Sequence, residues 1–97
     1  MDTATNDERA RLVEKAAAIL KAAGAREVYV FGSAAKGVLD DASDVDMAVC
    51  GLSPAVFFKA ASAASDALGR PLDLIDLDEE TPFTRYLKTE GELVRVG

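Results

Sequence analysis

Several residue types are missing or scarce in this chain of 97 residues, and each absence excludes a class of protein. There is no histidine, so a Ser-His catalytic triad is excluded. The single cysteine, Cys50, cannot form an intramolecular disulfide, which fits a reducing compartment. No apolar run is long enough to span a membrane, and the polar start lacks the apolar core of a signal peptide. We therefore expect a cytoplasmic protein without a membrane partner.

Basic residues are also in the minority. The chain has 11 Lys and Arg against 17 Asp and Glu, for a net charge of −6. This charge disfavours direct nucleic-acid binding, which depends on a basic surface, and would suit a basic protein partner or serve solubility alone. With 49% hydrophobic residues the composition is globular, and the length predicts a single domain over residues 1–97.

Apolar periodicity and turn residues predict an alternation of helices and strands. Thr5 and Glu8 have capping-box spacing, so we expect the first helix to have its N-cap at Thr5 and to end before Gly24. The further predicted helices cover 33–37, 54–68 and 82–91, and the predicted strands cover 28–31, 44–50, 72–77 and, as an edge strand, 93–96. This order predicts an α/β (α+β) fold in which helices flank a small sheet of three to four strands.

Three aromatic residues and the cysteine are interpreted as packing residues. Phe83, Tyr86 and Leu87 recur at helical spacing and are expected to form the inner face of the last helix. Tyr29 and Cys50 are also expected to pack, without a chemical role.

The central stretch carries the residues that point to chemistry. Gly32 and Ser33 follow an apolar strand, and ten residues separate them from Asp44 and Asp46, which open the next one. Gly32 lets the backbone approach a phosphate, and Ser33 would cap a short helix whose first amides are donors at a positive dipole end. Lys36, one turn further on, could neutralise phosphate charge.

The two aspartates predict a cation site. Residues two apart on a strand project to the same face, roughly 6.5 Å apart, so Asp44 and Asp46 can converge on one ion while Val45, Met47 and Val49 pack behind them. Mg²⁺ prefers a few carboxylates together with substrate phosphate oxygens and water.

A third acidic residue is expected from the later strand. Asp73 lies within PLDLIDL, where an unpaired charge would be costly, whereas Asp76 is on the opposite face and is expected to be solvated. Asp73 is therefore the preferred third ligand and the candidate proton acceptor for a hydroxyl.

Each of these signals has an ordinary structural explanation by itself. A serine after a strand is most often a helix N-cap, a D-x-D is usually a solvated strand end, and a lysine on a short helix is normally a surface charge. The combination favours a site for a metal and a nucleotide. A P-loop is excluded because the chain has no G-x-x-x-x-G-K-[ST].

At these residues the chain resembles the DNA polymerase β nucleotidyltransferase superfamily, and within it the minimal nucleotidyltransferases. Their signature is Gly-Ser, ten residues, then Asp-x-Asp, which Gly32, Ser33, Asp44 and Asp46 match without a gap. Asp73 falls where the family places its third acidic residue. Relatives often read G-S-R-A-R-G, whereas this chain has GSAAKG, with a lysine in place of the second arginine. Lysine lacks the bidentate fork with which arginine binds phosphate.

The resemblance implies a small mixed sheet flanked by helices, ATP as substrate and Mg²⁺, as two ions, as cofactor. It further implies an antitoxin that transfers AMP to a hydroxyl, a tyrosine, of a HEPN-type toxin. Two alternatives stay open: a non-catalytic module that neutralises its partner by occlusion, and a small-molecule nucleotidyltransferase of the aminoglycoside type. The sequence leaves the oligomeric state, homo- or hetero-oligomer, undecided.

Overall fold

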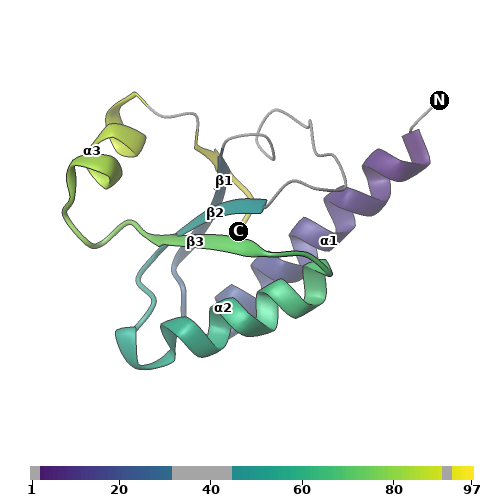
Figure 1. The fold of residues 1–97 in the computed structure, drawn as a ribbon, viewed down its shortest axis with the longest axis horizontal. Helices are drawn as coiled ribbons and strands as arrows, with labels where there is room; N and C mark the ends of the chain where they lie inside the picture. The colour runs from purple at the N-terminus through teal and green to yellow at the C-terminus, as the bar shows by residue number, and fades with distance from the viewer. Residues whose placement is uncertain (1–2, 32–44, 91–92) are drawn as a thin grey trace.

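The computed structural model describes residues 3–31, 45–90 and 93–97, with side chains from residue 10 onward. The three helices and four strands of these ranges alternate along the chain (Figure 1). In chain order they are α1 Thr3–Ala22, β1 Glu27–Phe31, β2 Val45–Cys50, α2 Pro54–Leu68, β3 Leu72–Asp76, α3 Pro82–Thr89 and β4 Val94–Arg95. The four predicted strands are thus confirmed with slightly different bounds. The predicted helix at 33–37 lies outside the described residues.

The strands form one mixed sheet in the order β3-β2-β1-β4. β1 is antiparallel to both β2 and β4, whereas β2 and β3 are parallel. The parallel pair is connected through α2, because two parallel strands need a crossover that runs back along the sheet. The result is the predicted small mixed sheet with flanking helices.

One face of the sheet packs against α1 and α2 (Figure 1). Alternate strand residues point to this face, and small alanines let the two helices approach it closely. Its buried residues are Ala16, Ala17, Leu20, Ala25, Val28, Val30, Val45, Met47, Val49, Leu52, Ala60, Ala64 and Leu68. The ends of α2 follow the sequence signals, since Ser53 caps its start before Pro54 and Gly69 ends it at a φ of 72°.

The opposite face has a smaller core under α3. Phe31, Ala48, Leu77 and Leu87 are buried there. The inner face of α3 differs from the prediction: Leu87 is buried, but Phe83 and Tyr86 are 48% and 55% exposed.

The cause of this difference is the start of the helix. Thr81 and Thr84 form a capping box, and the Thr84 hydroxyl also donates to the carbonyl oxygen of Glu79 at 2.6 Å. These bonds turn Thr84 inward, so the residue one turn later, Leu87, is buried with it. Tyr86 is therefore a surface residue and not the packing residue that the sequence suggested.

The first helix also differs at its start. α1 begins at Thr3, so Thr5 lies inside the helix and is not its N-cap. A capping-box spacing marks a favourable start, but it does not prevent an earlier one when further residues can continue the hydrogen-bonding pattern. Gly24 follows the helix with a φ of 121°, a conformation that favours glycine. None of the helices in the described ranges has the length and apolarity needed to cross a bilayer.

Candidate functional site

The candidate site lies where β1 ends and where β2 and β3 begin, at one end of the sheet (Figure 1). Phe31, the last residue of β1, is paired with Asp46 on β2, and Asp46 is paired with Asp73 on β3. Neighbouring strands are about 4.8 Å apart, and paired residues project to the same face. Two carboxylate side chains therefore stand next to each other across the sheet.

These carboxylates project away from α1 and α2. Val45 and Met47, the neighbours of Asp46 along β2, are fully buried on the helix side, so the alternation of the strand turns Asp46 to the other face. Asp46 is partly buried and Asp73 is exposed. The prediction that Val45, Met47 and Val49 pack behind the acidic residues is confirmed, since each is 0% exposed.

Asp76 occupies a different position from Asp73. It is paired with Val49 and lies on the helix side of the sheet, and its carboxylate accepts a hydrogen bond from the Asp78 amide at 2.9 Å. The register thus places Asp73, and not Asp76, beside Asp46. The chemical roles of Asp46 and Asp73 stay predictions.

The other predicted site residues lie outside the described ranges: Gly32, Ser33, Lys36 and Asp44. In the sequence Gly32 follows Phe31 and Asp44 precedes Val45. Gly32 is therefore joined to the end of β1 that is paired with Asp46, and Asp44 is joined to the start of β2, which carries Asp46.

The described pair fits the chemistry of a hard cation. Carboxylate oxygens are the ligands that Mg²⁺ prefers, and it is usually bound by one or two of them together with phosphate and water. Asp46 and Asp73 supply two such groups from rigid strands. Residues 3–31, 45–90 and 93–97 contain no group of three or more His, Cys, Asp or Glu side chains that could hold a metal by themselves.

Two other titratable groups on this face are held in their protonated forms. The Tyr29 hydroxyl donates to Glu27 Oε1 at 2.5 Å, and this bond, with burial, raises the pKa of Tyr29. Burial, followed by the nearby Asp78 charge, raises the pKa of the Cys50 thiol. A raised pKa lowers the population of the nucleophilic anion, so neither group is activated for attack.

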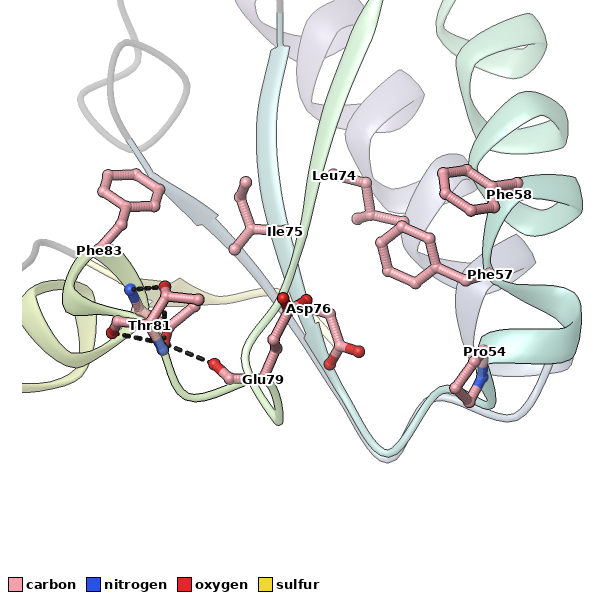
Figure 2. Close-up of a pocket in the computed structure, with 10 residues that line it drawn as sticks. Pro54, Phe57, Phe58, Leu74, Ile75, Asp76, Glu79, Thr81 and Phe83 are labelled. Carbon is pink, nitrogen blue, oxygen red and sulfur yellow. Dashed lines mark hydrogen bonds between the residues drawn. The ribbon is translucent and has the colours of Figure 1, made fainter.

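One surface feature was not found from the sequence. A groove of about 400 Å³ follows the outer edge of β3 between α2 and α3, lined by Phe57, Phe58 and Phe83 among others (Figure 2). The signal was present in the adjacent pair Phe57-Phe58, because two neighbouring helical residues cannot both point into the core. Phe58 is 81% exposed.

Comparison with known proteins gives a consistent result. The family model described as "Polymerase beta, Nucleotidyltransferase" matches residues 14–95. A search of curated proteins finds no match. Among solved structures, a protein assigned as a minimal nucleotidyltransferase is similar at 25% identity and a TM-score of 0.69, with 94% of each chain covered.

Two toxin–antitoxin structures are similar as well. A variant of the pair MntA–HpeT is 26% identical with a TM-score of 0.63, covering 82% of this chain and 68% of that one. A toxin–antitoxin structure with AMP-PNP is 24% identical with a TM-score of 0.69, covering 87% of this chain and 72% of that one, and this likeness is one of fold.

The matched residues 14–95 include the second part of α1 and all of the other helices and strands. They therefore include the two strands that carry the paired aspartates. The chain belongs to the polymerase β nucleotidyltransferase family.

Proposed function

We propose that this chain is an Mg²⁺-dependent nucleotidyltransferase that transfers AMP from ATP to a hydroxyl, a tyrosine, of a HEPN-type toxin, and so acts as its antitoxin. The observation that carries the proposal is the pairing of Asp46 with Asp73 on one face of the family's sheet. Similarity to a toxin–antitoxin structure at 26% identity supports a toxin as the partner. The AMP-PNP of a second similar structure supports an adenine nucleotide as substrate.

Each residue of the proposed site has a distinct task. Asp44, Asp46 and Asp73 would hold the cations, whose positive charge neutralises the triphosphate when they are bound. Gly32 and Ser33 would offer backbone and hydroxyl donors to the phosphates. Lys36 would add a positive charge there without the bidentate geometry of arginine.

The reaction balances with a single proton acceptor. The hydroxyl oxygen of the acceptor attacks the α-phosphorus, the bond from that phosphorus to the bridging oxygen of the β-phosphate breaks, and pyrophosphate leaves. Asp73 takes the hydroxyl proton, because it is the exposed member of the pair Asp46 and Asp73 and is therefore within reach of an acceptor outside the chain.

A direct test uses the full chain with its toxin, ATP and Mg²⁺, and measures the intact mass of the toxin. We expect a gain of one AMP that is lost with Asp46→Asn, with Asp73→Asn and with a chelator. Asp66→Asn is the matched control, since it removes the same charge from an exposed position on α2, away from the paired aspartates. Transfer that persists in both sheet variants would refute the proposed site.

A non-catalytic antitoxin is the second candidate. Its support is the GSAAKG stretch, in which lysine stands where relatives often have an arginine that grips phosphate. It predicts that the toxin stays neutralised, without a change in mass, when both Asp46 and Asp73 are replaced by asparagine. A small-molecule acceptor would instead be indicated by AMP transfer to an aminoglycoside without the toxin.

A further inference from the structure

The outer edge of β3 presents main-chain groups that no strand of the described ranges pairs with. Val45 N donates to the carbonyl oxygen of Pro71, and Leu77 N donates to that of Val49. In a parallel pair of strands, every second residue directs both its N–H and its C=O to the same neighbouring strand. The main-chain groups of the odd-numbered residues of β3 therefore bond to β2, and those of the even-numbered residues point away from the sheet. Leu74 lies at the centre of the outward set, and in the described part of the chain its N–H and C=O have no main-chain partner across this edge.

Aromatic side chains stand on both sides of this edge (Figure 2). Phe57 and Phe58 project from α2 and contact each other edge to face, with ring centroids 5.5 Å apart. Phe83 comes from α3 on the other side and contacts Phe31 in the same manner at 6.2 Å. The groove between them is about 400 Å³ in volume, and Leu74 and Ile75 form its floor. Exposed apolar surface of this kind, rimmed by polar groups, marks interaction sites.

The rim of the groove is acidic. Asp76 and Glu79 line it, and within the described ranges neither has a basic side chain at ion-pair distance. A second copy of the chain, with its net charge of −6, would bring the same carboxylates against them. The charge therefore disfavours edge-to-edge pairing of two copies and favours a basic partner.

We propose that the β3 edge binds an extended segment of a partner protein that adds a fifth strand to the sheet. The segment would exchange main-chain hydrogen bonds with Leu74. Two of its neighbouring residues, which point to opposite faces of the sheet, would place apolar side chains against Phe58 and Phe83. Lysine or arginine in the segment would meet Asp76 and Glu79. A row of outward N–H and C=O groups matches a strand in spacing and direction, and pockets on either side of it select the side chains.

This site is separate from the proposed transfer site. The groove surrounds the end of β3 at Asp76, whereas Asp46 and Asp73 are paired at its beginning. Binding of the segment therefore does not depend on AMP transfer, and Asp46→Asn should leave this binding unchanged.

The experiment selects binders from a random octapeptide library displayed on phage, with the full chain as target. Peptides that also bind the double variant Asp76→Lys, Glu79→Lys are removed. We expect the selected peptides to carry apolar residues at neighbouring positions, one for each face of the sheet, together with lysine or arginine. The best one, made synthetically, should slow the hydrogen exchange of the Leu74 amide, and Phe58→Ala, a change at an exposed side chain, should weaken its binding.

N-methylation of the peptide supplies a matched control. Blocking an amide that faces β3 removes one hydrogen bond and should weaken binding about tenfold, whereas blocking the next amide, which faces outward, should not. Equal loss at both positions would refute strand addition. So would a selection that enriches no peptide over the double variant, or a stable dimer formed through β3 in sedimentation experiments without peptide.

Discussion

Replacing Asp73 by asparagine separates chemistry from stability at the candidate site. The substitution keeps the size of the side chain and removes one negative charge from an exposed position on β3, opposite Asp46. If Asp73 functions in AMP transfer, its negative charge does not stabilise the fold, because Asp46 carries a like charge on the neighbouring strand. We therefore expect AMP transfer to be lost while the free energy of unfolding rises slightly.

The magnitude follows from the strand spacing. Two unit charges about 4.8 Å apart in water repel by about 0.9 kcal/mol, and physiological salt screens this to about 0.5 kcal/mol. For a domain of this size, that corresponds to a rise of about 2–4 °C in Tm. Loss of a positioned proton acceptor lowers the rate roughly 10²–10⁴-fold.

The assay combines AMP transfer with thermal and urea unfolding of the same samples. Met47→Ala is the contrasting variant, because Met47 is fully buried on the helix side of β2 and its truncation should cost about 2–5 kcal/mol. Asp73→Asn that transfers AMP at the wild-type rate would refute the role. A variant destabilised by more than about 1 kcal/mol would show a structural role for the carboxylate.

Three further predictions concern the face that carries the carboxylates. Leu87→Ala should lower the free energy of unfolding by about 2–5 kcal/mol, measured in urea, because Leu87 joins α3 to the small core, and a change below about 1 kcal/mol would contradict that packing. The folded state holds the phenolic proton of Tyr29 more tightly than the unfolded chain, so this stabilisation is complete below the ordinary tyrosine pKa of about 10 and is lost as the pH rises through the raised one. Urea midpoints between about pH 8 and 11 should therefore decline less in Tyr29→Phe than in the wild type. If the midpoints of the two proteins declined in parallel, this would contradict a raised pKa of Tyr29 in the folded state. Finally, alkylation of Cys50 by iodoacetamide should be slower than that of a free thiol and should accelerate in urea, since burial raises its pKa; equal rates in the two conditions would count against this.

Much of the fold could be predicted from local signals. The alternation on β2, with Val45, Met47 and Val49 on one face, placed Asp46 on the other, as the structure has it. The Ser53 cap and Gly69 stop of α2 were also visible, because these residues act on the helix ends by short-range hydrogen bonds and backbone conformation.

The rotation of α3 could not be predicted in the same way. Phe83, Tyr86 and Leu87 fit an apolar stripe, but the bonds of Thr84 to Thr81 and Glu79 turned the helix so that Leu87 faces inward and Tyr86 outward. A contact between a helix start and the preceding turn competes with apolar periodicity, and the sequence does not show which of the two prevails.

By itself, the sequence predicted that Asp46 and Asp73 take part in chemistry, and it determined on which side of its own strand each of the two stands, because strand alternation is a local property. Only the tertiary structure decided that β2 and β3 run parallel in a register that sets Asp73, and not Asp76, across from Asp46. It also decided that β3 is an edge strand with aromatic rings on both sides. Register and strand order depend on packing between segments far apart in the chain, and a shift of one residue would have turned the carboxylates to the other face.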